Sequence, residues 1–385
     1  MDPLSNLHVV YLTNFLAPDL VAICEAIGQQ VREFTVLASV PMERNRPWQP
    51  AASSLKVRLQ RTWTWTRQAK HPQGYQDVNY VHLPLDTPSQ LRALKPDVVV
   101  SAELGFRSVA AALNRRAGKY QHIIAVSVSE HTERNCGAMR QRLRRWLLRR
   151  ADLVTCNGPS AARYVASLGT DSQKIRIWNY ACDPQRPYRG DLQSPEHSTR
   201  PMRLLTVGQL TERKGVIEAQ HQLAAWALQH PECSLEWTVA GDGPLRPQLE
   251  QLSAPANLSS VFLGNIDADQ IRKQYEQHEV LLFPTLGDEW GLVVDEALAS
   301  GLVVIGSRFS QAVETLISEC QNGWSYWPTD TSGMSTALDA WLTMSADRRL
   351  AMRLAARRSV ADRTPESSAS QLLSAIESLL PRSSS

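Results

Sequence analysis

Short apolar runs alternate with helical stretches along this chain, and this alternation constrains its fold more than any other feature. Each run is rich in β-branched residues and is followed by a longer stretch of helical periodicity. Continuous apolar strands separated by helices are typical of parallel sheets covered by helices on both faces. The predicted strands are His8–Leu12, Phe34–Ala38, Asp97–Ser101, His122–Val128, Leu153–Cys156, Arg203–Val207, Leu235–Ala240, Val261–Leu263, Val280–Phe283 and Leu302–Ile305.

This pattern stops once, between Pro184 and Pro201, in a polar, proline-rich stretch typical of a linker. A chain of 385 residues suits two domains of ordinary size. We therefore expect an α/β protein with two doubly wound, Rossmann-like domains, 1–195 and 196–365, and a closing helix with a Ser-rich tail over 366–385. Ligands of such sheets bind beyond the carboxyl ends of the strands, so two domains facing each other would form a cleft lined by these loops.

The composition excludes several other classes of protein. Hydrophobic residues make up 43% and charged residues 21%, which excludes disordered, collagen-like and coiled-coil proteins. The net charge of +3 is too small to indicate nucleic acid as the main partner. No segment approaches the ~20 apolar residues needed to cross a bilayer, and the start of the chain has no basic n-region. A cytoplasmic protein is therefore expected.

The stretch Leu281–Gly301, LLFPTLGDEWGLVVDEALASG, is the richest in chemistry. An apolar strand ends at Phe283, a loop follows, and helical periodicity begins at Leu292. The free amides at a helix start bind anions, and Gly291 has no side chain to block the approach. The sequence therefore predicts a phosphate site at this turn.

Acidic residues flank this predicted phosphate site. Asp288 lies in the loop, and Glu296 lies on the helix, four residues after Leu292. Because carboxylates repel phosphate, these two are better suited to accept hydrogen bonds from sugar hydroxyls. The alternative is that Asp288 and Glu289 are exposed loop charges, and that Asp295 and Glu296 interact favourably with the helix dipole.

A second stretch, Leu204–Gly215 (LLTVGQLTERKG), has a strand that runs into Gly208 and a lysine that opens the next helix. Lys214 would neutralise a diphosphate bound at the facing loop. Taken alone, the same residue also fits a solvated lysine at a helix start. The turn AGDGPL, Ala240–Leu245, follows the next strand and is first of all a tight-turn sequence.

In the first half, His131 follows a strand in the segment VSVSEHTERN. A histidine at a strand end would hydrogen-bond a sugar hydroxyl or polarise a leaving group, although it equally fits a structural role. The turn Glu103–Phe106 is a further candidate for lining the cleft. The alternative is that Gly105 merely allows the chain to turn there. Trp63 and Trp65 would stack on a sugar acceptor or pack at an exposed edge.

The segment Met139–Arg150, MRQRLRRWLLRR, predicts a basic amphipathic helix. Such a helix fits weak peripheral contact with an anionic membrane, here at the inner face. It also fits a helix that packs its apolar side on the sheet and keeps its arginines in water.

Together these motifs resemble those of family 4 glycosyltransferases, which have the GT-B fold. PTLGDEWGLVVDEALASG is similar to the donor-binding signature of that family, VGQLTERKG to its V-G-R-L-x-x-x-K-G motif, and AGDGPL to its G-x-G-P turn. The segment Ala151–Gly169 resembles a further family motif. The resemblance is strongest over residues 203–325.

The resemblance implies a role for each matching residue. Asp288 falls on the acid that contacts the donor sugar, where the family normally has Glu, and neighbouring Glu289 is a candidate to share this task. The implied donor-binding residues are Gly208, Gln209, Arg213, Lys214, Trp290, Gly291, Leu292, Val293 and Glu296. Among these, Lys214 and the amides of Leu292 and Val293 would meet the diphosphate, and Glu296 would bind the ribose hydroxyls.

Two matches depart from the family pattern. Gln209 stands where the family usually has Arg, so diphosphate binding should weaken unless another base, such as Arg213, substitutes. His131 is matched to the first-domain histidine near the donor sugar, within the flank SEHTE.

The resemblance implies a retaining transfer of a sugar from a nucleotide-diphosphate sugar to an acceptor hydroxyl, in surface polysaccharide or glycoconjugate synthesis. No cofactor and no metal site are expected, because no D-x-D-type metal site is evident and positive groups would replace the cation. Two alternatives stay open: a nucleotide-sugar epimerase or hydrolase of the same fold, and a non-catalytic nucleotide-sugar-binding relative.

Overall fold

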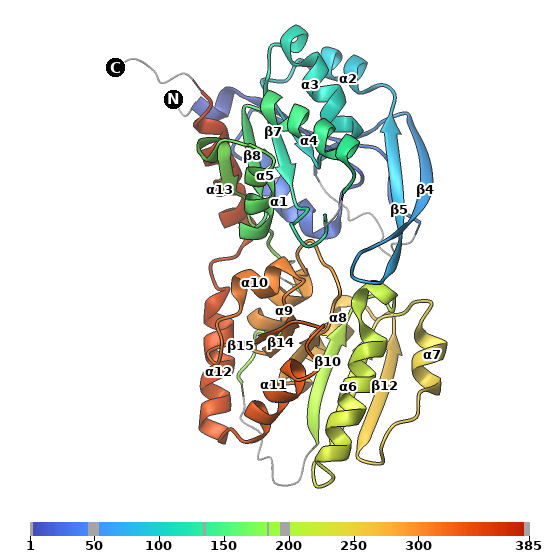
Figure 1. Ribbon diagram of the computed structural model, residues 1–385. Coiled ribbons are helices and arrows are strands. Elements are labelled where there is room, and N and C mark those ends of the chain that lie inside the picture. The colour runs from blue at the N-terminus through green and yellow to red at the C-terminus, as the bar shows by residue number, and fades with distance from the viewer. Residues whose placement is uncertain (1–2, 45–53, 134–135, 183–184, 193–200, 381–385) are drawn as a thin grey trace. The chain divides into compact units, whose positions relative to one another are not determined.

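The computed structural model describes residues 3–44, 54–133, 136–182, 185–192 and 201–380 (Figure 1). Contacts divide the chain into two compact units. Unit 1 comprises Met1–Ala69, Val78–Ala181 and Arg363–Ser385, and unit 2 comprises Lys70–Asp77 and Cys182–Asp362. The domain boundary expected at 195 lies outside the described residues. The helix expected within 366–385 is present, and its residues belong to unit 1.

The sheet of unit 1 has the order β3-β2-β1-β6-β7-β8-β9, and its described strand pairs are all parallel. A separate pair is formed by β4 and β5. The strands of this unit are β1 (His8–Thr13), β2 (Glu33–Ala38), β3 (Lys56–Leu59), β4 (Thr62–Lys70), β5 (Gln76–Pro84), β6 (Val98–Ala102), β7 (Gln121–Val126), β8 (Leu153–Cys156) and β9 (Ile175–Ile177).

Helices cover both faces of this sheet. Val9 and Tyr11 of β1 pack with the apolar side chains of α1 and α13, whereas Val10 and Leu12 join a second cluster with residues of α2 and α3. Alternate residues of a strand point to opposite faces, which explains why β1 is apolar throughout. The helices are η1 (Pro3–Asn6), α1 (Pro18–Gly28), α2 (Thr87–Leu94), α3 (Phe106–Gly118), α4 (Ala138–Arg150), α5 (Pro159–Ser167), η2 (Ser172–Lys174) and α13 (Pro365–Glu377).

Unit 2 contains a second parallel sheet, of order β12-β11-β10-β13-β14-β15. Its strands are β10 (Met202–Val207), β11 (Leu235–Ala240), β12 (Leu258–Gly264), β13 (Val280–Phe283), β14 (Val303–Ser307) and β15 (Gly323–Tyr326). Its helices are η3 (Glu212–Lys214), α6 (Val216–Gln229), α7 (Arg246–Gln251), α8 (Ala268–Gln277), α9 (Leu292–Ala299), α10 (Gln311–Leu316), α11 (Gly333–Leu342) and α12 (Ala346–Ser359). Trp226, Trp237 and Trp341 are fully buried in its core.

Each sheet has one point at which the strand order reverses. In unit 1 the point lies between β1 and β6, and in unit 2 it lies between β10 and β13. The loops after these neighbouring strands separate toward opposite faces of the sheet, and ligands of open α/β sheets bind in the crevice that this creates. The fold thus selects the loops after β10 and β13 in unit 2, and those after β1 and β6 in unit 1.

The polar stretch between the predicted domains is partly described, over residues 185–192. Within it, the backbone amide of Tyr188 donates a hydrogen bond to Ser300 Oγ at 2.9 Å, and Gly190 O accepts one from Arg357 Nη1 at 2.9 Å. This part of the stretch is therefore held within unit 2. In the described ranges, no helix is both long enough and apolar enough to cross a membrane.

Candidate functional site

Two loops of unit 2 meet at the point where its strand order reverses. The loop after β10 carries Gly208, Gln209, Arg213 and Lys214, and the loop after β13 runs from Pro284 to the start of α9. Backbone hydrogen bonds join the loops, because Arg213 O accepts from Leu286 N at 2.8 Å and from Thr285 Oγ1 at 3.1 Å. The two stretches that the sequence singled out are therefore held against each other.

Charged side chains from both loops form one network around Asp288. Lys214 Nζ forms an ion pair with one oxygen of this carboxylate, and Arg213 Nη1 lies 3.7 Å from the other. Arg213 Nη1 also donates to Gly287 O at 3.0 Å. Burial disfavours the charged form of Arg213, but the carboxylates of Asp288 and Asp77 outweigh it and raise the pKa of the guanidinium. Two cations thus converge on one acid beyond the carboxyl ends of β10 and β13, the central strands of the sheet.

The tip between β4 and β5, Lys70–Asp77, is part of this network, which the sequence did not indicate. Asp77 Oδ2 lies 3.1 Å from Arg213 Nε, and the amide of Gln76 donates to Glu212 Oε2 at 2.7 Å. The side chain of Tyr75 is buried against Gly287, where an added Cβ would lie only 2.6 Å from its hydroxyl oxygen. The tip therefore fixes the position of Arg213.

The turn into α9 depends on Gly291, which has a φ of +105°. A Cβ at this position would also lie 2.9 Å from the ring of Phe283. Glycine is therefore required by the backbone conformation and by the space available. The first-turn residues Leu292 and Val293 are half-buried, and their amides belong to the set that has no acceptor within a helix.

Trp290 is buried and holds the loop in place. Its indole Nε1 donates to Asp295 Oδ2 at 2.6 Å, and its carbonyl accepts from Ala312 N at 3.1 Å. The carbonyl of neighbouring Glu289 accepts from Gln311 Nε2 at 2.7 Å, while the Glu289 side chain is exposed. Trp290 thus acts on the site through the position of α9 and of the loop.

Glu296 lies buried on α9, with both carboxylate oxygens in contact with protein groups. Oε1 is ion-paired with Arg186 Nε at 2.8 Å, and Oε2 accepts a hydrogen bond from Tyr275 OH at 2.7 Å. Burial, together with the negative charge of Glu296, raises the pKa of the Tyr275 hydroxyl and keeps it a donor. A carboxylate has about four acceptor positions, so Glu296 retains capacity for further donors.

A small hollow lies at the same place. Its lining combines the carboxyl end of β10 and the loop after it with the end of β13 and the residue that follows. The lining residues are Thr206, Val207, Gly208, Gln209, Lys214, Val216, Phe283 and Pro284. Lys214 Nζ lies 5.3 Å from the centre of the Phe283 ring, so the ammonium is held over an aromatic face.

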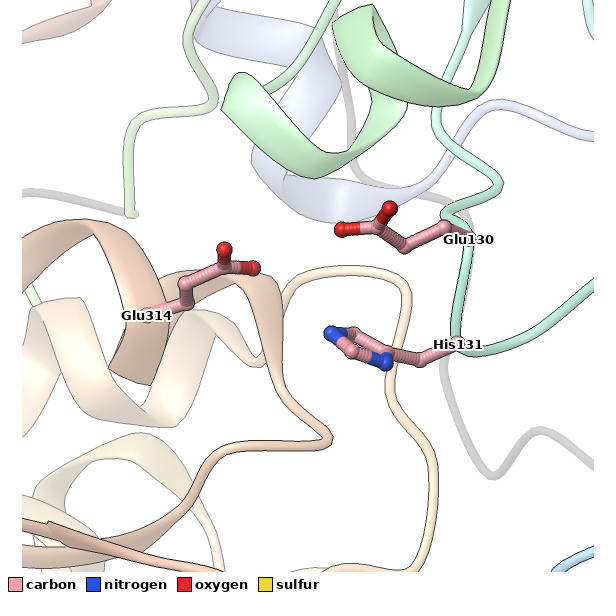
Figure 2. A group of neighbouring side chains, drawn as sticks. All are labelled: Glu130, His131 and Glu314. Carbon is pink, nitrogen blue, oxygen red and sulfur yellow. The ribbon is translucent and has the colours of Figure 1, made fainter. Parts of the chain in front are cut away.

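His131 lies in unit 1, on the loop that follows β7 (Figure 2). Its side chain is 9% exposed, and its backbone amide donates to Ser129 Oγ at 3.2 Å. Neighbouring Glu130 is ion-paired with Arg163. Figure 2 also draws Glu314, which lies on α10 of unit 2. The other residues predicted to contact the donor all belong to unit 2.

Unit 1 has a buried polar cluster where its strand order reverses, centred on Glu103. This residue has a φ of +66°, which is rare for a residue with a side chain, and its Oε1 accepts a hydrogen bond from Ser127 N at 3.1 Å. Oε2 is buried and has no hydrogen-bond partner among the described residues. Burial raises the pKa of Glu103, and the bonds from Ser127 and the charge of Arg107 oppose this rise. Strain and an unsatisfied acceptor make Glu103 a second candidate.

The basic helix α4 packs part of its surface within unit 1. Leu147 and Leu148 are buried, and the largely buried Arg144 is ion-paired with Glu133 at 2.6 Å. Met139, in contrast, is 84% exposed. The apolar side of this helix therefore contributes to the core, as the second interpretation of the sequence expected, and its first turn stays in solvent. Arg144 departs from that interpretation, because it is buried and not in water.

Comparison with solved structures defines the fold. The chain aligns over 97% of its length with 100% of the chain of HepE from Anabaena, solved in a complex with UDP, with a TM-score of 0.71 and 14% sequence identity. Two parallel, doubly wound units with this likeness define the GT-B fold of glycosyltransferases.

Sequence comparison then defines the family. Residues 17–181 match the glycosyl transferase 4-like domain, and residues 201–344 match glycosyl transferases group 1. The chain belongs to this family of glycosyltransferases. It is 30% identical over 190 residues to the sulfoquinovosyl transferase of Arabidopsis thaliana, and 26% identical over 280 residues to the glycogen synthase of Mycobacterium tuberculosis.

These alignments cover 46% and 70% of the chain. They span 35% of the first relative and 66% of the second, which is less than two thirds of either protein.

Proposed function

We propose that this protein transfers a sugar from a nucleotide-diphosphate sugar to an acceptor hydroxyl with retention of configuration. The observation that carries this proposal is the convergence of Lys214 and Arg213 on Asp288, in the loop that leads into α9, at the reversal of strand order in unit 2. Helix amides and cations together are the groups that bind a diphosphate. They also stabilise the negative charge that develops on the diphosphate when its bond to the sugar breaks.

In this proposal each residue has one task. The amides of Leu292 and Val293, next to Gly291, hold one phosphate, and Lys214 moves from Asp288 to the other. Asp288 then accepts hydrogen bonds from the donor sugar, and the exposed Glu289 is a candidate for the same task. Trp290 positions the loop.

Other residues bind the ribose and form the rest of the proposed site. Glu296 is fixed by Arg186 and Tyr275, so a ribose hydroxyl would meet an oriented carboxylate. Gly208 and Gln209 line the hollow beside Lys214, where the lack of a side chain on Gly208 leaves room for the donor. Gln209 carries no positive charge, and Arg213 supplies it instead. The guanidinium of Arg213 must first leave a protein acceptor before it binds phosphate. His131 is proposed to act on the donor sugar from unit 1.

The donor is a substrate, and no cofactor or divalent cation is part of this proposal, since Lys214, Arg213 and the α9 amides supply the positive charge. The acceptor is proposed to belong to a polysaccharide or glycoconjugate. Weak contact of α4 with an anionic membrane, at its inner face, is a further proposal, supported by the exposed first turn of this helix.

The test combines donor binding with product release. Thermal shift of the full chain with a set of nucleoside diphosphates and their sugars identifies the donor, because a ligand that binds the folded state raises the melting temperature. Release of nucleoside diphosphate is then measured in EDTA, with and without saccharide acceptors. We expect release to need an acceptor and to persist in EDTA. Release at the same rate without an acceptor would instead identify a hydrolase, whereas an epimerase would convert the sugar of the donor without net release of nucleoside diphosphate.

A further inference from the structure

Three aromatic side chains of unit 1 contact one another at the surface. The ring centres of Trp63 and Trp65 on β4 are 5.1 Å apart, and the ring of Trp65 lies 6.2 Å from that of Phe106, the first residue of α3. Trp63 is 63% exposed and Phe106 is 42% exposed. Large aromatic rings normally gain stability through burial, so a row left in solvent calls for a partner.

Two further apolar side chains near the start of β4 are also exposed to solvent. Leu59 at the end of β3 and Leu85 after β5 are 54% and 62% exposed. Leu85 lies close to the start of β4, because its amide donates to Arg61 O at 2.8 Å. Exposed apolar residues that gather on neighbouring strands mark a binding surface, whereas single ones do not.

The same region is strongly basic. The segment Lys56–Lys70 contains five basic residues and no acidic one. All five are exposed: Lys56, Arg58, Arg61, Arg67 and Lys70. Two of them have acidic neighbours, Glu33 for Lys56 and Asp86 for Arg61.

Arg67 is the basic residue that lies on the same strand face as the two tryptophans. Residues two apart on a strand point to the same side, so Arg67 shares one face of β4 with Trp63 and Trp65. The row of rings therefore continues into a guanidinium, which pairs well with a carboxylate or a phosphate.

The row of rings begins at the end of unit 1 where the sheet reverses its strand order. Phe106 starts α3 directly after the loop that carries Glu103, at the carboxyl end of β6. This end of β6 is next to the reversal of strand order, where ligands of such sheets bind. A ligand stacked on the three rings would thus extend from this end of unit 1 along β4.

We propose that Trp63, Trp65 and Phe106 bind an acidic oligosaccharide acceptor, and that Arg67 pairs with its carboxylate or phosphate group. Sugar rings have an apolar face that packs on an aromatic ring, while their hydroxyl groups stay in water. A row of rings requires an acceptor of at least two sugar units. The proposal rests on the proposed function, since it names the class of acceptor for that reaction.

Calorimetry with the full chain tests this surface, with oligogalacturonate as the acidic probe and maltohexaose as the neutral one. We expect Trp63→Ala and Trp65→Ala each to weaken oligogalacturonate binding by about tenfold, and Trp63→Phe to retain most of it. Arg67→Gln should weaken binding of the acidic probe while leaving the neutral one unchanged. Matched controls are Thr66→Ala on the other face of β4, Leu113→Ala, an exposed apolar residue of α3, and Arg116→Gln.

Three outcomes would overturn the proposal. The first is that neither saccharide binds the wild-type chain, and the second is that the tryptophan variants bind as well as the controls. The third is that the variants lose binding only to phosphatidylglycerol vesicles, because the surface would then serve a membrane. Circular dichroism of each variant confirms that the chain is folded.

The donor assay separates this proposal from the proposed function. If nucleoside diphosphates raise the melting temperature but no saccharide binds, the acceptor surface is wrong and the transferase assignment stands. If no nucleotide or nucleotide sugar binds, the proposed function fails. Saccharide binding at Trp63 would then identify a carbohydrate-binding surface without the proposed reaction.

Discussion

Lys214 and Asp288 form an ion pair between the loops after β10 and β13. The pair joins the lysine proposed for the diphosphate to the acid proposed for the sugar, so each of these side chains already interacts with the opposite charge of the other. We expect a bound donor to separate them, with the diphosphate replacing Asp288 at Lys214 and a sugar hydroxyl replacing Lys214 at Asp288. This exchange makes the two residues respond differently to substitution.

Lys214→Ala should weaken binding of the donor by about tenfold to a hundredfold, because it removes a hydrogen bond between charged groups. The melting temperature should change by only about 3 °C, since Arg213 stays near Asp288. Calorimetry with the nucleoside diphosphate identified by thermal shift measures the first effect. Lys273→Ala, which removes an exposed lysine of α8, is the control. A large loss of stability with unchanged binding would show that Lys214 is structural.

Asp288→Asn should have the opposite effect on the nucleotide alone. Because the ion pair between Asp288 and Lys214 is lost, the nucleoside diphosphate without a sugar should bind as tightly as before or more tightly. Transfer of the sugar should fall by about tenfold or more, because a charged acceptor of the sugar hydroxyls is lost. Glu289→Gln, one residue along, shows whether the exposed neighbour shares this task. Weaker binding of the bare nucleotide in Asp288→Asn would contradict the exchange.

Glu296→Gln tests recognition of the ribose. The wild-type chain should prefer a nucleoside diphosphate over its 2′,3′-dideoxy analogue, and the variant should lose most of this preference. The substitution also removes the ion pair with Arg186, which costs stability because the attraction between a buried carboxylate and a partly buried guanidinium is lost. Tyr275→Phe is the control, since it removes a hydrogen bond to Glu296 and keeps the charge. If Glu296→Gln melts earlier but still distinguishes the two nucleotides, Glu296 holds α9 and does not bind ribose.

The sequence predicts the strands that form the buried parts of both sheets. Leu153–Cys156, Leu235–Ala240 and Val280–Phe283 match the observed strands at both ends, since each is rich in apolar residues and is bounded by polar or turn residues. The loops that follow such strands were also identified, because turn residues and a new helical pattern mark them. The meeting of the loops after β10 and β13 follows from their place in the sheet.

Most edge strands of the fold were not predicted, although the predicted strand Val261–Leu263 lies within β12 at one edge of the sheet of unit 2. The four residues of β3 (Lys56–Leu59) are all exposed, and β4 alternates Thr with Trp, so neither has the apolar run of a buried strand. The contact between Asp77 and Arg213 joins residues far apart in the sequence and leaves no local pattern. Glu103 was placed in a turn, but its φ of +66° and its buried carboxylate depend on neighbouring strands. Only coordinates reveal such residues.

Acid should destabilise unit 1 through His122, which lies on β7. Burial, helped by the charge of Arg115, lowers the pKa of His122 from 6.5 to about 3, and its Nε2 lies 2.9 Å from Ser101 Oγ. A histidine with a lowered pKa in the folded state stabilises the fold above its unfolded pKa. This stability is lost as the pH falls from about 6.5 toward 3, by about 2 kcal/mol at pH 5.

His122→Gln should therefore reduce the dependence of the free energy of unfolding on pH over this window, because the amide can still bond Ser101 but does not titrate. Urea unfolding of the wild type and the variant at about pH 8 and about pH 5 measures the difference. His221→Gln, which changes an exposed histidine of α6, should leave the dependence as it is. His278, whose pKa is also lowered by burial, keeps some acid sensitivity in both proteins. Equal loss of stability at pH 5 in wild type and His122→Gln would mean that His122 takes up no proton on unfolding.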